Sequence, residues 1–250
     1  PTQDLVVQEA LLSLTINGFP AYHLLYLPGQ ETALCLGFLL TSGVIEATAD
    51  IQELRLLPVE PAAGRHFFQV QVRLAKTFAN RRDLTAILAA AVLSGDPSAA
   101  VPLTAAQFQA APAREVKIDL ATLLNLMAGL PQRQEIFQQT GGTHAIYLAE
   151  TPSGDVILGA EDVGRHNALD KVVGAALLKG GDFGRMLAAS TGRQPTEMIS
   201  KCLSAGTPVV ATKGVPTSMG VEVAEKAGIT LVGLVRGDTM IVYSHPERIR

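Results

Sequence analysis

From residue 144 onward, predicted strands and helices alternate, and glycine or proline separates most of them. The short apolar runs suit buried strands, and the segments between them carry apolar residues at helical spacing. Pro195 suits the first position of a helix, and Gly180, Gly206 and Gly228 suit helix ends. Because helices that join neighbouring strands form crossovers, the sequence predicts an α/β fold: a mixed, mostly parallel sheet with helices on both faces. The expected elements are helices 120–130 and 132–138, a hairpin of strands 144–150 and 155–160, helix 166–179, strand 186–190, helix 195–205, strand 209–212, helix 218–227 and strand 229–235.

The N-terminal third is predicted to be a smaller α/β unit. Asn17-Gly18 indicates a β-hairpin because both residues tolerate positive φ. Strands are expected on either side of this turn, at 13–16 and 21–27. Residues 31–42 predict a mostly buried helix, and alternating apolar and polar residues predict a strand at 68–74.

These patterns divide the chain into three parts. The Ala-rich middle part also carries prolines, and it is expected to be a variable connection with one helix near 83–93. The expected parts are the N-terminal α/β subdomain at 1–76, the connecting segment at 77–116 and the core domain at 117–250.

Composition and charge exclude several classes of protein. Apolar residues make up 48% of the chain and charged residues 17%, so the chain can bury a core and is not disordered. The net charge is −3, which gives no basic field for a nucleic acid. The longest nearly unbroken apolar run, 84–93, is far short of the roughly 20 residues of a membrane-spanning helix. We therefore expect a cytoplasmic protein that binds neither nucleic acid nor membrane.

Four loops follow strands of the predicted core sheet, and each carries glycine together with a cation. Ligands of open α/β sheets collect beyond the carboxyl ends of the strands. Glycine lets a ligand approach backbone N–H groups, and arginine binds phosphate with two parallel hydrogen bonds. Together the loops favour an anionic, phosphate-bearing ligand over ordinary turn chemistry. They are residues 161–167, 190–193, 213–217 and 236–239.

Some residues of these loops also have a purely structural interpretation. Asp162 suits a cap of the following helix at least as well as a ligand contact. Arg165 and Asp170 could pair on a solvated face of that helix, where an ion pair contributes little. Thr217 or Ser218 is expected to cap helix 218–227.

The histidines and cysteines are the remaining candidates for chemistry. For His144 and His166 the sequence leaves both a ligand contact and a structural role open, because both lie near loops rather than within an apolar stripe. Cys35 and Cys202, the two cysteines of the chain, lie among apolar residues of predicted helices. The sequence therefore indicates small buried side chains rather than reactive thiols.

The chain also contains several longer motifs. They are GGTHA (141–145), EDVGRHNALDK (161–171), TGRQPTEM (191–198), GVPTSMGVEVAEKAG (214–228), LVGLVRGD (231–238) and YSHPERI (243–249), together with LTINGFP (14–20), LPGQETALCLGFLLTSGVI (27–45) and VRL (72–74). These motifs resemble the FdhD/NarQ family of formate dehydrogenase accessory sulfurtransferases. The resemblance covers most of the chain except 77–116, and the run EDVGRHNALDK is highly specific.

The resemblance implies a cytosolic homodimer with a core similar to the cytidine-deaminase fold. Such a protein takes sulfur, as a persulfide, from a cysteine desulfurase. It passes the sulfur to molybdenum or tungsten bis(molybdopterin guanine dinucleotide), which is then delivered to apo-formate dehydrogenase. GDP is expected to mimic the guanine nucleotide arms, and no metal is bound directly.

The expected cofactor-binding residues combine the four loops, the GGTHA motif and the stretch near the C-terminus that matches the family's cofactor contacts. They are Gly142, Thr143, His144, Asp162, Arg165, His166, Gly192, Arg193, Lys213, Pro216, Thr217, Leu234, Val235, Arg236, Gly237, Asp238 and Thr239.

The sequence departs from the family at the sulfur carrier. Members that transfer sulfur carry a Cys-x-x-Cys loop before the GGTH motif, whereas residues 76–140 of this chain contain no cysteine. A thiolate is needed to hold a persulfide sulfur, so no catalytic residue is predicted. Two functions stay open: cofactor binding with sulfur transfer, as in the family, or cofactor binding by a chaperone that transfers no sulfur.

A zinc deaminase is the less favoured alternative, suggested by the order of strands and helices. Such an enzyme needs His or Cys with Glu at one helix start and Pro-Cys-x-x-Cys at the next. The corresponding segments here are Arg-His-Asn at 165–167 and Gln-Pro-Thr-Glu-Met at 194–198. Two of the three metal ligands are therefore missing.

Overall fold

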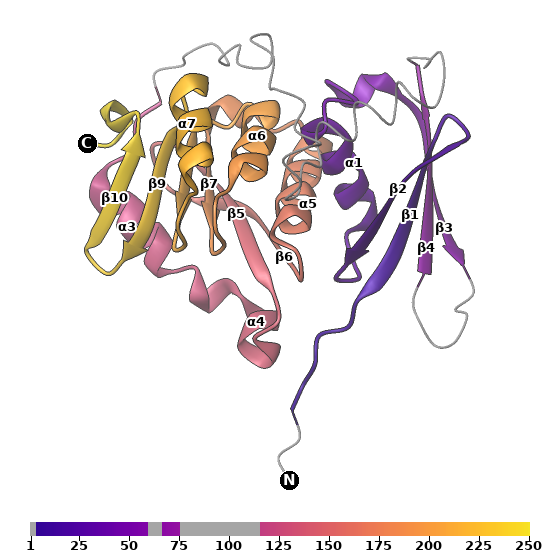
Figure 1. The fold of residues 1–250 in the computed structure, drawn as a ribbon, viewed down its shortest axis with the longest axis horizontal. Helices are drawn as coiled ribbons and strands as arrows, with labels where there is room; N and C mark the ends of the chain where they lie inside the picture. Colours follow the sequence, from indigo (N-terminus) through magenta and orange to yellow (C-terminus); the bar gives the residue numbers. More distant parts are fainter. Residues whose placement is uncertain (1–3, 60–66, 76–115) are drawn as a thin grey trace.

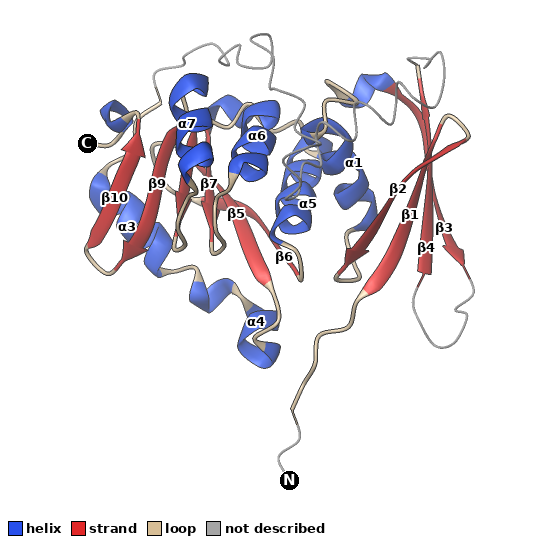
Figure 2. Cartoon of the chain, viewed as in Figure 1, coloured by secondary structure: helices blue, strands red, loops and turns tan. Residues whose placement is uncertain are grey.

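The chain folds into two mixed β-sheets with helices between and outside them (Figure 1). A computed structural model describes residues 4–59, 67–75 and 116–250. Helices α1 and α5 lie between the sheets, and α3 covers the outer face of the C-terminal sheet (Figure 2). The predicted mixed α/β fold is thus confirmed. The connecting segment lies almost wholly outside the described residues, so the helix near 83–93 and the domain boundaries stay predictions.

The N-terminal sheet has the strand order β2-β1-β4-β3. The predicted hairpin is confirmed, because Asn17 and Gly18 have φ of 48° and 81° between antiparallel β1 and β2. The Asn17 carboxamide oxygen also accepts the backbone N–H of Leu74, which ties the turn to β4. The edge strand β3 was not among the predicted elements. The four strands are β1 (Ala10–Ile16), β2 (Phe19–Tyr26), β3 (Ile51–Val59) and β4 (Phe67–Leu74).

The C-terminal sheet has the strand order β10-β9-β8-β7-β5-β6. Its centre is parallel, since β7 pairs with β8 and β8 with β9 in that sense. The pairs β5–β6, β5–β7 and β9–β10 are antiparallel, so the sheet is mixed as predicted but its parallel part is confined to three strands. The strands are β5 (His144–Glu150), β6 (Val156–Asp162), β7 (Met186–Ser190), β8 (Val209–Thr212), β9 (Thr230–Arg236) and β10 (Thr239–Ser244).

Helices cover both faces of this sheet, as predicted. One apolar cluster joins the N-terminal sheet, the helices between the sheets and the inner face of the C-terminal sheet. A second cluster joins α3 to the outer face. The described α-helices are α1 (Glu31–Thr41), α3 (Leu120–Ala128), α4 (Glu135–Thr140), α5 (Arg165–Leu178), α6 (Thr196–Ala205) and α7 (Ser218–Ala227). None of the helices in the described ranges is both long and apolar enough to cross a membrane.

Helices α1 and α5 cross closely because each has a glycine at the crossing. A Cβ on Gly37 would overlap the backbone carbonyl of Asp170, and one on Gly174 would overlap that of Ala33. Side chains at these two positions would force the helices apart. The crossing therefore holds the N-terminal unit against the C-terminal sheet.

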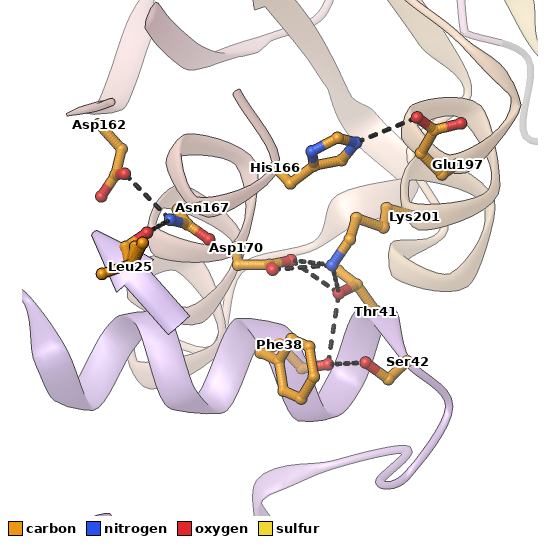
Figure 3. A network of polar contacts seen from close by, with 10 residues as sticks. All are labelled: Leu25, Phe38, Thr41, Ser42, Asp162, His166, Asn167, Asp170, Glu197 and Lys201. Atoms are coloured by element: carbon orange, nitrogen blue, oxygen red, sulfur yellow. Dashed lines mark hydrogen bonds and ion pairs between the residues drawn. The ribbon is translucent and has the colours of Figure 1, made fainter. Parts of the chain in front are cut away.

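A buried polar network reinforces this crossing (Figure 3). The Lys201 ammonium on α6 lies 2.8 and 2.7 Å from the two carboxylate oxygens of Asp170, and it also donates to the Thr41 hydroxyl. Asp170 is only 1% exposed, so the expected pairing with Arg165 on a solvated face is wrong. The face of α5 that carries Asp170 packs against α1 instead, and Lys201 on α6 is the cation that pairs with Asp170.

Candidate functional site

Strand directions bring the four predicted loops to one edge of the C-terminal sheet, at the bottom of Figure 1. Parallel β7, β8 and β9 all end at this edge. The antiparallel strand β5 begins there and β6 ends there, where His144 pairs in register with Asp162. The loops that follow β6, β7, β8 and β9 are therefore neighbours, and we refer to them together as the loop edge.

Backbone hydrogen bonds join the loops after β7 and β8 to each other and to strand β9. The N–H of Gln194 donates to Val215 O across 3.0 Å, and the N–H of Leu234 donates to Gly214 O across 2.9 Å. A Cβ on Gly214 would come within 3.0 Å of the Gly192 carbonyl, so this close contact requires glycine. The Thr212 hydroxyl adds to these contacts, because it donates to Gly192 O across 2.6 Å and accepts the N–H of Gly214. The loops after β7 and β8 therefore hold each other in place.

A cavity of about 430 Å³ opens between the loop edge and α3. Lys213 and Arg236 line one side of it, together with the predicted site residues Val235 and Gly237. The other side is apolar and consists of Leu124, Met127 and Ala128 from α3. A volume in this range and a mixed lining are typical of small-molecule sites. This arrangement suits a ligand with an anionic group and an apolar or aromatic body.

The three α3 residues of this cavity were not predicted as site residues. Their sequence signal was only the apolar face of a helix, which is also what packing against a sheet requires. Leu123 and Leu126 of the same helix are indeed buried in the core, and so is Met127, which also lines the cavity. The part of α3 that lines the cavity is determined by the positions of the loops after β8 and β9, which lie opposite it.

A second group of charged side chains surrounds Gly192 on the same edge. His144 Nδ1 and the Arg165 side chain lie so close that a Cβ on Gly192 would touch both. Glu197, at the start of α6, lies 3.4 Å from both Arg165 Nη2 and His166 Nε2. Burial lowers the pKa of His144, and the charges of Arg165, Arg193 and His166 lower it further. At neutral pH His144 is therefore an uncharged imidazole among cations.

The pKa of Glu197 lies below its ordinary value. Burial of the carboxyl acts to raise this pKa, but hydrogen bonding and the charges of His166 and Arg165 outweigh the burial. Glu197 is thus an anion that partly neutralises the Arg165 guanidinium beside it. Sequence reasoning missed this residue, although its place in the first turn of α6, where acidic residues are common, was a signal.

Some buried polar atoms of this group have no hydrogen-bond partner in the described part of the chain. They are Arg165 Nε and Gln194 Oε1. Gln194 is 1% exposed, so its carboxamide oxygen is well inside the surface. Buried polar atoms are usually paired, because an unpaired one costs free energy. A ligand that supplies donors and acceptors here would remove that cost.

Several predicted site residues instead have structural roles. Asp162 is fully buried and lies 2.7 Å from the Lys171 ammonium. The Thr143 hydroxyl donates to Glu161 across 2.6 Å. The Thr217 hydroxyl accepts the N–H of Gly220, so this residue caps α7 as the structural interpretation expected.

The remaining predicted residues form turns or lie open to solvent. Gly142 is exposed and packs beside Val7, and Arg193 is exposed next to the His144 group. Pro216 is bridged to Gln194, and Leu234 adopts a φ of 52°. The segment 236–239 is the turn of the β9–β10 hairpin, in which Asp238 and Thr239 are exposed.

Neither cysteine is placed for sulfur chemistry in this fold. Cys35 on α1 and Cys202 on α6 are both buried and free. Burial raises the pKa of the Cys35 thiol far above its ordinary range and that of Cys202 to about 12. A neutral, buried thiol is a poor nucleophile. As for metals, the described residues contain no group of three His, Cys, Asp or Glu side chains that could hold an ion.

Comparison with known proteins gives consistent matches. The family model described as "FdhD/NarQ family" matches residues 7–250. A relative from Xanthomonas axonopodis pv. citri, named sulfur carrier protein FdhD, is 34% identical over 250 residues, which cover 99% of this chain and 86% of the relative. Relatives of the same name from Streptomyces coelicolor and Sulfolobus acidocaldarius are each 33% identical over 254 residues; the matches cover 98% and 99% of this chain and 89% and 92% of those proteins.

A solved structure has the same overall fold. The crystal structure of a formate dehydrogenase accessory protein from Desulfotalea psychrophila superposes with a TM-score of 0.75. The match covers 99% of this chain and 91% of that chain, at 23% sequence identity. At this identity the likeness concerns the fold.

Proposed function

The chain belongs to the FdhD/NarQ family, and from that membership we propose that it takes part in the maturation of a formate dehydrogenase by binding the guanine-dinucleotide form of its molybdenum cofactor at the loop edge. The cofactor is the cargo of the protein. The partners of such a protein are a cysteine desulfurase, as the sulfur source, and the apo-dehydrogenase that accepts the cofactor. In this proposal the protein acts in the cytoplasm as a homodimer.

The observation that carries the proposal is the two-sided cavity at the loop edge. Lys213 and Arg236 offer cations for a diphosphate, and α3 offers an apolar wall against which a flat base can pack. A cavity of about 430 Å³ accommodates one nucleotide arm rather than the whole cofactor.

The group around Gly192 supports a second point of contact. Arg165 Nε can donate to an acceptor of the cargo, and Gln194 Oε1 can accept a hydrogen bond, since neither atom has a partner in the described residues. Helices α5 and α6 both begin here, and neither has a side-chain cap at its N-terminus. Free helix N-termini favour anions. The residues present therefore fit a ligand with several phosphates.

Within this proposal, the buried cysteines favour binding over sulfur transfer. The related proteins are named sulfur carriers, but a persulfide needs an accessible thiolate, and Cys35 and Cys202 are both buried with raised pKa values. The second candidate function is accordingly that of a chaperone that binds the cofactor and carries sulfur on neither of its two cysteines. In both versions the loop edge has the same role.

Titration calorimetry with GDP tests the proposal. We expect binding of one GDP per chain, and we expect Lys213→Ala to weaken it about tenfold or more, because a charge-assisted hydrogen bond to phosphate is lost. Lys226→Ala is the matched control, since Lys226 is an exposed lysine in the last turn of α7, away from the loop edge. Absence of GDP binding, or equal losses in both variants, would remove the assignment of the cavity.

A further inference from the structure

A second cavity of about 330 Å³ lies where the N-terminal unit meets the edge strand β6. Its walls come from the loop between β2 and α1, the segment that leads into α4, and strands β5 and β6. It shares no lining residue with the cavity at the loop edge. Leu27, Pro28, Ile136 and Ala160 supply apolar surface, and Tyr147 and Arg133 supply hydrogen-bond donors.

Tyr147 places an unsatisfied hydroxyl at the wall of this cavity. The residue is 5% exposed, and its hydroxyl oxygen has no hydrogen-bond partner in the described part of the chain. The ring extends over β6 only because Gly159 has no side chain, since a Cβ there would overlap the ring. The charged groups that act on the hydroxyl, Glu161, Arg133 and Glu135, all line the cavity as well.

This hydroxyl is a donor at neutral pH. Burial raises the pKa of Tyr147 to about 12, and the carboxylates of Glu161 and Glu135 add to the increase. A buried hydroxyl without a partner costs free energy that phenylalanine would avoid in the same place. The presence of tyrosine therefore indicates a partner that residues 4–59, 67–75 and 116–250 do not supply.

The other charged groups of the cavity differ in how far they are already engaged. The Lys171 ammonium is satisfied by Asp162 and by the carbonyls of Leu27 and Glu161. The Glu161 carboxylate accepts the N–H groups of Ile136 and Phe137 and the hydroxyl of Thr143.

Arg133 and Glu135 are the groups that stay open to a ligand. Arg133 is exposed at the rim, and its guanidinium makes no ion pair with any described residue. It remains available, with the Tyr147 hydroxyl, to donate to oxygen atoms. Glu135 is also exposed at the rim, where its charge disfavours a ligand with two negative charges.

We propose that this cavity binds a small monocarboxylate with a short apolar body. Its carboxylate oxygens accept hydrogen bonds from the Tyr147 hydroxyl and the Arg133 guanidinium, and its apolar part packs against Leu27 and Ile136. The acidic rim makes phosphate a poorer ligand than a monocarboxylate. Because the walls come from both units of the fold, the bound molecule also joins the N-terminal unit to the C-terminal sheet.

Butyrate and inorganic phosphate are the probes that test this site, by titration calorimetry on the full chain. We expect one butyrate per chain and weaker binding of phosphate. Tyr147→Phe and Arg133→Gln should each weaken butyrate binding about tenfold, which is the loss of one hydrogen bond to a charged group. Arg236→Ala, which alters only the loop-edge cavity, should leave butyrate binding unchanged.

Several results would overturn the proposal. One is the absence of butyrate binding at millimolar concentration, and another is an unchanged affinity in Tyr147→Phe whose circular dichroism shows the native fold. Tighter binding of phosphate than of butyrate would refute the carboxylate assignment. A crystal grown with butyrate that shows only water on the Tyr147 hydroxyl would do the same. None of these outcomes bears on GDP binding, so this site and the proposed function fail separately.

Discussion

Lys171 Nζ lies 2.7 Å from Asp162 Oδ2, in the interior where the side chains of the two residues are 2% and 0% exposed. The same carboxylate accepts the backbone N–H groups of Leu27 and Gly164 and the Asn167 carboxamide. One buried aspartate thus connects the N-terminal unit, the end of β6 and the first turn of α5.

Loss of the lysine should destabilise the fold strongly. Lys171→Met leaves the Asp162 carboxylate buried without a cation, so we expect the free energy of unfolding to fall by about 3–5 kcal/mol. Urea denaturation followed by circular dichroism measures this change. Lys226→Met, which breaks an exposed pair with Glu222, should change stability little. Similar losses in the two variants would show that the buried pair does not stabilise the fold.

The crossing of α1 and α5 predicts an unusual response to alanine. Alanine normally stabilises a helix relative to glycine by about 1 kcal/mol. Gly174→Ala should instead destabilise the protein, because the new methyl group overlaps the carbonyl of Ala33. Thermal unfolding measures the effect, and Ala175→Gly on the same helix is the control, with the small loss that helix propensity alone predicts. Stabilisation by Gly174→Ala would mean that the helices do not cross as closely as described.

His144 should make stability depend on pH below neutrality. Burial and the neighbouring cations lower its pKa in the folded chain, so the unfolded chain binds a proton that the folded chain does not. Stability should therefore rise with pH between the lowered folded pKa and the ordinary value of 6.5, and it should be lost as the pH falls through that window. Urea midpoints at several pH values test this. His144→Gln should flatten the profile, whereas His23→Gln, at an exposed position on β2, should not.

The sequence predicted the C-terminal elements well because their boundaries are local. Gly206 and Gly228 end α6 and α7 in the left-handed conformation, as expected from residues without a Cβ. The sequence did not predict strand β10, because the glycine of the segment 236–239 suits a ligand loop as well as the hairpin turn that it forms. Local signals therefore predicted the positions of the loops, but not the strand that follows the last of them.

The candidate site could be predicted only in part, for a physical reason. The strand directions that bring four loops to one edge follow from the alternation of elements, so the edge was predictable. Whether a charged side chain on that edge faces solvent or the interior depends on contacts far away in sequence. Asp170 is buried because α1 packs on α5, and Lys201 reaches it from α6. Likewise, α3 lines the cavity because it packs on the outer face of the C-terminal sheet, and no local sequence motif specifies that packing.

Arginine at the loop edge should control nucleotide affinity. Arg236→Ala and Arg193→Ala should each weaken GDP binding roughly 10- to 100-fold, since a hydrogen bond to a charged group contributes about 1.5–3 kcal/mol. Titration calorimetry gives both affinities, with Arg55→Ala on the N-terminal sheet as the control. An effect of Arg236→Ala alone would limit the nucleotide site to the cavity beside α3. No effect of either substitution would exclude the loop edge as the nucleotide site.

The two cysteines should be inert in the folded protein. A thiol reagent such as Ellman's reagent should modify neither Cys35 nor Cys202 in the native chain and both after unfolding in urea, because both are buried and free. A cysteine desulfurase with cysteine as its sulfur source should accordingly leave the mass unchanged, where a persulfide would add about 32 Da for one sulfur atom. An accessible thiolate is what accepts a sulfane sulfur, and burial raises the pKa of both thiols. A persulfide on Cys202 in the native protein would contradict this prediction and would place sulfur beside the buried Lys201, on the helix that begins at the loop edge.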